Sequence, residues 1–164
     1  MDSCKENEIY SNIPSIKFKT AYLTLDPESR TDTLIGIVFT YKDGDGDIGL
    51  NEADTFAPYD RKELNGIITN PFYYNVYIDY LQIINGQPQP VIKPSTTTDT
   101  LRYTVRIPSL TPDGRHKAIR GDIDHQFSPP LFKVDSDSIL LRIKIYDRAL
   151  HESNTIESPL LLIR

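Results

Sequence analysis

The chain has 164 residues and a formal net charge of −5, with 38% hydrophobic and 25% charged residues. This length suits one domain with a single core, and the composition is that of a folded protein rather than a disordered one. The acidic balance, with no run of lysine or arginine, argues against a nucleic-acid-binding protein, because phosphate binding needs a concentrated basic face. No apolar stretch is long enough to cross a bilayer.

The first 14 residues are polar, lack hydrophobic periodicity and are predicted to form a tether ahead of a domain spanning residues 15–164. They contain Cys4, the single cysteine of the chain, which excludes a disulfide framework and a thiolate metal cluster. Two interpretations of Cys4 remain open. It is a free thiol in a terminal segment, or it is the lipid acceptor of a bacterial lipoprotein whose apolar signal segment has been removed.

The rest of the chain shows the period-two alternation of β-strands. In chain order, strands are expected at residues 16–25, 33–41, 72–80, around 91, 101–107, 119–127, 139–145 and 155–163. The first shifts its apolar face midway, which indicates a bulge or an edge position. The second is nearly all apolar and belongs in the centre of a sheet, whereas Pro159 gives the last an edge or bulged position. The best helical candidate is a turn or two at residues 60–64, stopped by Asn65-Gly66.

Turn residues separate these strands. Asn85-Gly86 and the Pro-Asp-Gly sequence at 112–114 predict chain reversals. About seven antiparallel strands with such turns predict an all-β, immunoglobulin-like sandwich, with a small barrel as the alternative. One connection is much longer than the others, since about thirty residues separate Lys42 from Phe72, and long loops of this kind are usually functional or ordered by a bound group.

The long loop begins with Asp-Gly-Asp-Gly-Asp-Ile-Gly-Leu at residues 43–50. Three aspartates on alternate residues repel one another unless a cation neutralises them, and Ca²⁺ is the hard ion that oxygen-rich loops bind. The glycines allow the backbone to curl, so that carbonyls can join the shell. An EF-hand is not expected, because Ile48 replaces its turn glycine, Asp54 replaces its bidentate glutamate, and strands flank the loop. The sequence therefore predicts a calcium site in an end loop of the sandwich.

A distant aspartate is expected to reach the same loop. Asp147 follows the strand at 139–145, and in an immunoglobulin-like sandwich the loops after the second and sixth strands lie at one end. Asp147 is then a further ligand, or Arg148 is the counter-charge that makes an ion unnecessary. The alternative for the whole loop is a solvated acidic turn whose carboxylates bond nearby amides. The candidate calcium ligands are Asp43, Asp45, Asp47, Glu52, Asp54 and Asp147.

Catalytic patterns are not found in the sequence. The three histidines lack zinc-binding spacing, and no nucleophile elbow, phosphate-binding loop or dinucleotide fingerprint occurs. Asp122 and Asp124 share one face of a strand and are expected to face water, which does not suit paired acid–base catalysis. Tyr73 and Tyr77 share the face opposite the core residues of their strand. That face is either an exposed strip for sugars or proteins, or a face covered by the long loop.

Residues 39–50, Phe-Thr-Tyr-Lys-Asp-Gly-Asp-Gly-Asp-Ile-Gly-Leu, resemble a motif of uncharacterised surface lipoproteins of Bacteroidetes-type bacteria. The C-terminal part of those proteins is similar to residues 145–149, Ile-Tyr-Asp-Arg-Ala, followed by Ser153-Asn154-Thr155 and a last strand. The resemblance implies an outer-membrane lipoprotein of the cell envelope, with an immunoglobulin-like fold, no established activity and Cys4 as its lipid acceptor. Cys4-Lys5-Glu6 is also similar to signals that send such lipoproteins to the cell surface.

The sequence therefore predicts a non-enzymatic envelope module in which Ca²⁺ orders the long loop. The membrane is contacted only through a lipid on Cys4, and the loop or the tyrosine face binds an unknown protein or glycan. One alternative is a glycan-acting enzyme or an accessory carbohydrate-binding subunit, of which the enzyme needs a cleft with two converging carboxylates. Another is a purely structural domain whose acidic loop is solvated.

Overall fold

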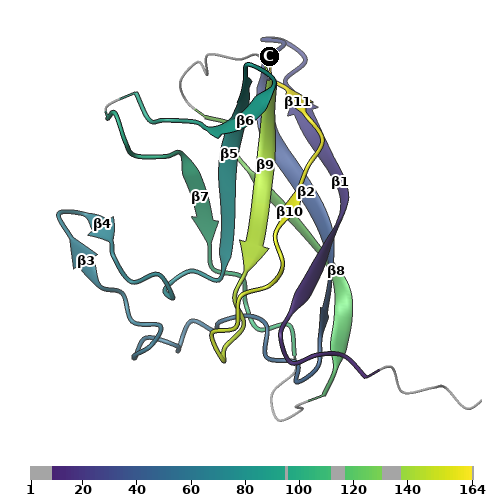
Figure 1. The fold of residues 1–164 in the computed structure, drawn as a ribbon, viewed down its shortest axis with the longest axis vertical. Helices are drawn as coiled ribbons and strands as arrows, with labels where there is room; N and C mark the ends of the chain where they lie inside the picture. The colour runs from purple at the N-terminus through teal and green to yellow at the C-terminus, as the bar shows by residue number, and fades with distance from the viewer. Residues whose placement is uncertain (1–8, 95, 112–116, 131–137, 164) are drawn as a thin grey trace, which may run out of the picture.

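The computed structural model describes residues 9–94, 96–111, 117–130 and 138–163. Within these ranges the regular elements are all β-strands, and they form two facing sheets with the core between them (Figure 1). The all-β sandwich class is therefore confirmed. A helix that could cross a bilayer does not occur in this part of the chain.

The first sheet has the order β1-β2-β8, with both pairings antiparallel. Its strands are β1 (Ser15–Leu25), β2 (Asp32–Asp43) and β8 (Ile119–Phe127). The apolar strand β2 lies in the centre, as its sequence predicted. The edge strand β1 has a register shift between Phe18 and Thr20, so the expected bulge and the expected edge position both occur.

The second sheet is built around β5 and β9, which pair with each other. Its strands are β5 (Val76–Ile84), β6 (Gln87–Pro90), β7 (Arg102–Val105), β9 (Ser138–Ile145), β10 (Ile156–Glu157) and β11 (Leu161–Leu162). Both β10 and β11 pair with β9, one before and one after Pro159. The proline thus interrupts an edge strand, where a missing amide is tolerated.

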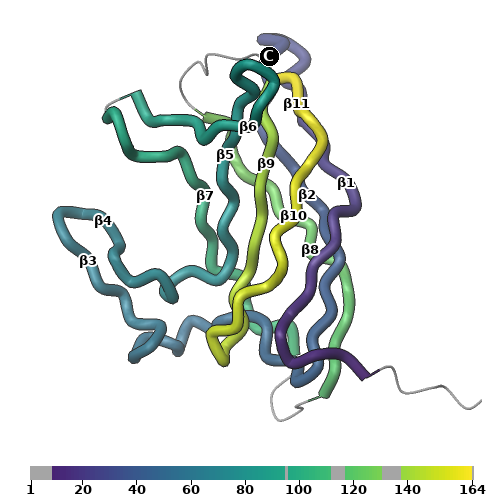
Figure 2. The backbone as a smooth tube through the Cα atoms, in the orientation of Figure 1, coloured from purple at the N-terminus to yellow at the C-terminus, as the bar shows by residue number. Residues whose placement is uncertain are grey.

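The chain alternates between the sheets as in an immunoglobulin-like sandwich (Figure 2). It passes from β1 and β2 in the first sheet to β5, β6 and β7 in the second, returns to the first with β8, and ends with β9, β10 and β11 in the second. This order brings the loop after β2 and the loop after β9 to the same end of the molecule, at the bottom of Figure 1.

The third strand begins later than its sequence pattern predicted, at Val76 rather than Phe72. Asn75 explains the difference, because its side chain accepts a hydrogen bond from the Ile107 amide (2.8 Å) and donates one to the Ile107 carbonyl (3.0 Å). The Asn75 side chain thus adds to the backbone hydrogen bonds that Asn75 makes with Val105 and Tyr146. The strand extends to Ile84, where Asn85 and Gly86, both at positive φ, form the predicted reversal into β6.

The prediction of a helical turn at residues 60–64 is wrong. The segment instead forms a small hairpin of β3 (Glu63–Leu64) and β4 (Ile67–Ile68) that stands apart from the sandwich in Figure 1. Asn65 and Gly66 have φ values of 51° and 78°, the pair of left-handed conformations that joins two antiparallel strands directly. The turn expected at 112–114 and the residue Cys4 lie outside the described residues.

The outer tyrosine face is covered at Tyr77, which is only 8% exposed. Its hydroxyl donates a hydrogen bond to the Pro71 carbonyl of the long loop, and its ring packs edge-on against Tyr146. Phe72 packs against the same Tyr146 ring, at 5.7 Å between centroids. Of the two interpretations, coverage by the long loop is therefore correct for Tyr77, whereas Tyr73 belongs to the loop itself.

Candidate metal centre

Two aspartates from opposite sheets close the core at the loop end. In β2 the inward residues Ile35, Ile37, Phe39 and Tyr41 are followed, two positions on, by Asp43, which is fully buried. In the same way, Ile145 is the last inward residue of β9, and Asp147 follows it two positions on and is only 3% exposed. Because a strand places every second side chain on one face, both carboxylates point into the end of the core.

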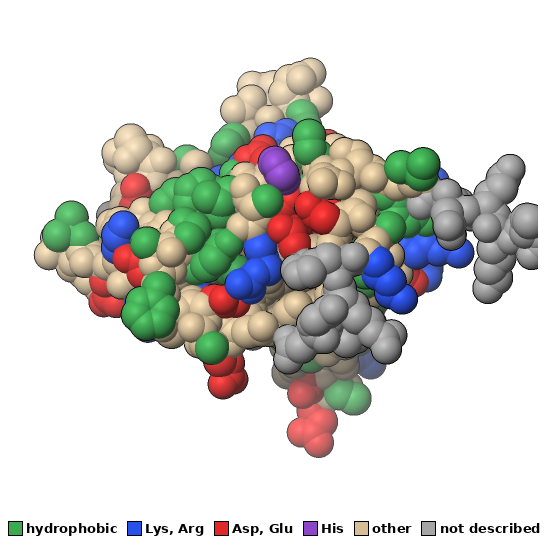
Figure 3. All heavy atoms as spheres, turned by 90° about the horizontal axis from the view of Figure 1, so that it is seen from below, with side chains coloured by type: hydrophobic (Ala, Val, Ile, Leu, Met, Phe, Trp, Pro, Cys, Tyr) green, Lys and Arg blue, Asp and Glu red, His purple; other side chains and the backbone are tan. Residues whose placement is uncertain are grey.

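The acidic loop brings a third carboxylate to this pair. Oxygen atoms of Asp43, Asp47 and Asp147 lie within 4.8 Å of one another. The loop is held there by pairing of Ile48 with Asp147 and by a hydrogen bond from the Arg148 amide to the Asp47 carbonyl (3.2 Å). Figure 3 views this end and shows acidic side chains gathered beside a histidine. The convergence that the strand order predicted is thus present.

Backbone and histidine donors orient these carboxylates. Asp43 Oδ2 accepts a hydrogen bond from the Asp47 amide (2.9 Å), and Asp47 Oδ2 accepts one from the Ala149 amide (3.0 Å). Asp147 accepts one from the His151 amide (2.7 Å), and its other oxygen lies 2.8 Å from His151 Nδ1. Donors that fix the orientation of carboxylates in this way are typical of the surroundings of metal ligands.

One oxygen of each loop aspartate remains without a donor. Asp43 Oδ1, Asp45 Oδ1 and Asp47 Oδ1 are buried and have no hydrogen-bond partner among the described residues. Nearly all buried polar atoms in proteins have a partner, and burial of an uncompensated charge is costly. These oxygens therefore mark a place where a cation, or a proton, would lower the free energy of the folded state.

The pKa values of the cluster are raised for the same reason. Burial and, to a smaller extent, the neighbouring carboxylates raise the pKa of Asp43 and of Asp47 to about 6. Burial also raises the pKa of Asp147, although its hydrogen bonds with His151 oppose the shift. The hydrogen bond to Asp147 raises the pKa of His151 in turn. The cluster thus holds protons more tightly than ordinary aspartates when no cation is bound.

Two glycines of the loop are required by its geometry. Gly46 has a φ of 73°, and a Cβ there would lie 2.2 Å from the Lys117 carbonyl oxygen. Gly49 has a φ of 109°, and a Cβ there would lie 2.2 Å from the Pro108 carbonyl oxygen. Only glycine fits such positions, so the loop can curl tightly enough to direct alternate aspartates toward one point.

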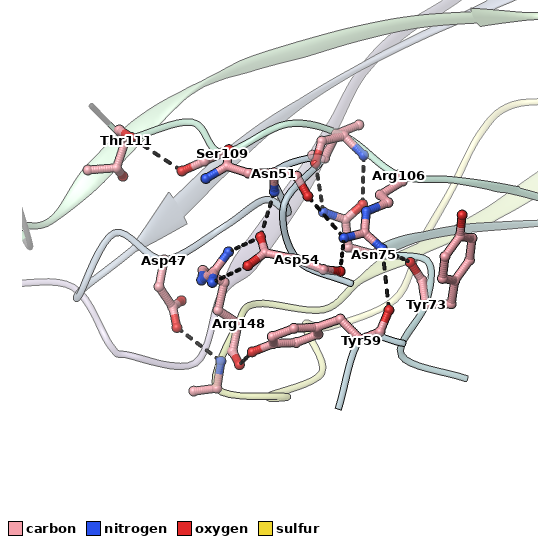
Figure 4. A network of polar contacts seen from close by, with 12 residues as sticks. Asp47, Asn51, Asp54, Tyr59, Tyr73, Asn75, Arg106, Ser109, Thr111 and Arg148 are labelled. Carbon is pink, nitrogen blue, oxygen red and sulfur yellow. Dashed lines mark hydrogen bonds and ion pairs between the residues drawn. The ribbon is translucent and has the colours of Figure 1, made fainter. Parts of the chain in front are cut away.

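The remaining candidate ligands lie elsewhere. Asp54 forms a two-point ion pair with Arg148, with 2.8 Å between Oδ1 and Nη2, and this pair lowers the pKa of Asp54 (Figure 4). Arg148 is therefore engaged with Asp54 rather than placed among the three clustered aspartates. Glu52 is exposed and lines a pocket beside the loop. Among the described residues, the converging group consists of Asp43, Asp47 and Asp147, so it contains neither Glu52 nor Asp54, and Asp45 lies outside it as well.

Sequence reasoning missed Arg106, which holds the second half of the long loop. Its guanidinium donates hydrogen bonds to four backbone carbonyls and lies 5.1 Å from the centroid of the Tyr73 ring (Figure 4). The four acceptors are the carbonyls of Asn51, Asp54, Tyr59 and Tyr73. The alternation of its strand gave Arg106 an outward position, but no sequence signal linked it to segments about fifty residues earlier.

No protein-family model, curated protein or solved structure matches this chain. The candidate site is therefore interpreted from its own geometry. Its donors are carboxylate oxygens, without a thiolate or imidazole in the converging group, and such a set binds hard cations.

Proposed function

We propose that this protein is a non-enzymatic binding module of the bacterial cell envelope whose loop end is ordered by Ca²⁺. One observation supports the bound ion most directly. Asp43 is completely buried and its Oδ1 has no partner among the described residues, while carboxylate oxygens of Asp43, Asp47 and Asp147 lie within 4.8 Å of one another. Asp45 supplies a further buried, unpartnered oxygen. A bound divalent cation would offset much of the charge of the three converging carboxylates, Asp43, Asp47 and Asp147.

Calcium fits these residues better than magnesium. Ca²⁺ accepts six to eight oxygens at irregular angles, at about 2.3–2.6 Å, whereas Mg²⁺ demands a near-octahedral shell and retains several waters. The ligands come from a curled loop and from a strand end of the opposite sheet, and both are rich in backbone carbonyls. Mixed carboxylate and carbonyl ligation from irregular backbone is the usual calcium arrangement.

A binding role suits the way in which the carboxylates are held. Asp43 and Asp147 are buried and Asp47 is partly buried, and each accepts a hydrogen bond from an amide of its own loop or of the loop opposite, an arrangement that suits an ion ligand better than a group presented to a substrate. We further propose that the module is a lipoprotein of the outer membrane attached through Cys4, which the lipoprotein motif resemblance supports. The ordered loop then carries the surface that contacts a protein or glycan partner.

Thermal unfolding with Ca²⁺ and with a chelator tests the ion. At a free concentration one hundred times its Kd, Ca²⁺ should stabilise the protein by about 2.7 kcal/mol. Asp43→Asn should abolish this response, because it removes the most deeply buried ligand. Asp122→Asn is the matched control, since Asp122 is exposed on β8 and pairs with Lys19. An equal midpoint with Ca²⁺ and with chelator would reject the calcium site.

Membrane fractionation tests the lipid anchor independently. In the host cell, the precursor carrying its own signal segment should partition with membranes, and Cys4→Ser should shift it to the soluble fraction. A conservative change at Ser3 in the same segment serves as the control. Unchanged partitioning of the Cys4→Ser variant would exclude lipidation at this residue and leave the calcium proposal unaffected.

A further inference from the structure

A pocket of about 560 Å³ lies beside the acidic loop, between residues 50–55, Tyr73 and the segment after β7. This volume is within the range of small-molecule sites, roughly 300–1,000 Å³. One part of its lining is mainly apolar and consists of Leu50, Tyr73 and Pro108. Another part is polar and includes Asn51, Glu52 and Thr55.

Three polar side chains that line this pocket have no partner in the part of the chain that the structure describes. The Asn51 amide, the Glu52 carboxylate and the Thr55 hydroxyl are exposed and make no hydrogen bond or ion pair with any described residue. Asn51 takes part in the fold only through its backbone. Together the three side chains offer both donors and acceptors around an aromatic and aliphatic lining.

Arg106 lines the pocket and uses its hydrogen-bond donors to hold the pocket walls. The guanidinium is bound to the carbonyls of Asn51, Asp54, Tyr59 and Tyr73, so it fixes both walls before any ligand arrives (Figure 4). Its donors are directed at these carbonyls rather than at the pocket mouth. A preformed wall reduces the ordering cost of binding.

We propose that this pocket binds a neutral carbohydrate unit. An ionic ligand of either sign is disfavoured, because the lining holds one charge of each sign, Glu52 and Arg106, and the hydrogen bonds of the Arg106 guanidinium go to backbone carbonyls. A cation finds only the single carboxylate of Glu52 there. A wholly apolar ligand would leave the polar groups of Asn51, Glu52 and Thr55 desolvated. A sugar ring suits both the polar and the apolar lining of the pocket. Its hydroxyls can form hydrogen bonds with the polar side chains, and its C–H face can pack on Tyr73 and Leu50.

This inference rests on the proposed calcium-ordered loop in one respect. Leu50 and Asn51 directly follow the acidic segment, and the Leu50 amide is anchored to the Ile107 carbonyl (2.9 Å). If a cation orders residues 43–49, its removal loosens one wall of the pocket. Carbohydrate binding should then weaken in chelator.

The test uses the full chain, loaded with Ca²⁺, and follows backbone amide shifts by NMR. The probes are glucose, mannose, galactose and N-acetylglucosamine at high concentration, followed by oligosaccharides of the sugar with the largest effect. We expect saturable shifts at Asn51, Glu52, Thr55 and Tyr73. Glucuronate is the anionic probe. The proposal is overturned if no sugar shifts these amides, or if glucuronate binds more tightly than every neutral probe.

A double variant gives the site-specific readout. Asn51→Ala with Glu52→Ala should raise the Kd of the responding sugar about tenfold, because two hydrogen bonds are lost while the fold keeps its backbone contacts. Glu28→Ala, in the turn between β1 and β2, is the control and should leave the Kd unchanged. An unaltered Kd in the double variant would also overturn the proposal.

The outcome is separable from that of the calcium proposal. Sugar binding with equal melting midpoints in Ca²⁺ and chelator would retain the pocket and reject the ion. A calcium-dependent midpoint without any sugar-induced shift would retain the ion and reject the pocket.

Discussion

The two halves of the long loop differ in how their acidic and carbonyl groups are compensated. In residues 51–74 Asp54 pairs with Arg148, and four backbone carbonyls accept hydrogen bonds from the Arg106 guanidinium, so this segment is held by cations of the chain itself. In residues 43–50 Asp43 and Asp47 converge with Asp147, and the Oδ1 atoms of Asp43, Asp45 and Asp47 have no partner among the described residues. The chain thus neutralises one half internally and leaves the other half to a proton or a bound cation.

This difference shows in the pKa values. The ion pair with Arg148 lowers the pKa of Asp54, whereas burial raises the pKa of Asp43 and Asp47 to about 6. Aspartates a few residues apart therefore respond oppositely to pH and to added cations. Acidic content alone does not identify a metal site; what matters is whether the fold already supplies the counter-charge.

The largest expected effect comes from the internally neutralised half. Arg106→Ala should reduce the free energy of unfolding by about 2–4 kcal/mol, because four carbonyls lose a charged donor. Arg106→Lys should recover only part of this, since an ammonium cannot reproduce the planar fork of donors. Chemical denaturation measures both.

The control for Arg106 is another arginine on the same sheet. Arg142 pairs with Glu157 at an exposed site on β9 and β10. Arg142→Ala should cost about 0.5 kcal/mol or less. If the two alanine variants were equally stable, Arg106 would not organise the loop.

The second prediction concerns the half that lacks internal cations. In chelator at pH 7, Asp43→Asn should stabilise the protein by about 1–2 kcal/mol, because it removes a buried charge that repels its neighbours. In saturating Ca²⁺ the same variant should be less stable than the parent, because a ligand is lost. A stabilising effect of equal size in both conditions would mean that no ion binds there.

The third prediction is a pH dependence with a definite sign. In chelator, the folded protein holds protons on Asp43 and Asp47 up to a pKa of about 6, whereas the unfolded chain releases them near its ordinary value of 3.8. The free energy of unfolding should therefore fall as the pH rises from about 4 to 7, by roughly 1–2 kcal/mol. His151, whose pKa is also raised, adds to the loss at the upper end. Melting midpoints measured in chelator give this profile.

Calcium should change that profile. Because the ion binds the deprotonated carboxylates, its stabilising effect should grow from pH 5 to pH 7.5 and should be smallest at the acidic end. The double variant Asp43→Asn with Asp47→Asn should flatten the profile in chelator. A calcium effect that did not vary with pH would argue against carboxylate ligation.

The smallest effect belongs to the Asp54–Arg148 pair. A double-mutant cycle with Asp54→Asn and Arg148→Met should give a coupling of about 1 kcal/mol, because the pair is bidentate and only partly exposed. Neither single variant should remove the response to Ca²⁺. Loss of that response in Asp54→Asn would place Asp54 in the ion site and contradict the separation of the two halves.

Parts of the site could have been read from strand alternation alone. Counting from Ile35 in steps of two reaches Asp43, and counting from Ile139 in steps of two reaches Asp147, so both had to face the core if the strands continued. The fold order then predicted that they meet. The ion pair of Asp54 could not be foreseen, because its partner, Arg148, lies 94 residues away. The hairpin at 63–68 was missed because its Asn-Gly turn also suits a helix end.

The amino-acid pattern alone determined the all-β class, most strand positions, the turn at Asn85-Gly86 and the presence of a glycine-rich acidic loop, because these depend on neighbours along the chain. Tertiary structure alone decided which carboxylates converge, which one is taken by Arg148, and that Arg106 builds the wall of a pocket. The physical reason is that charge compensation depends on distance in space. A carboxylate is a ligand or an ion-pair partner according to what the fold places beside it.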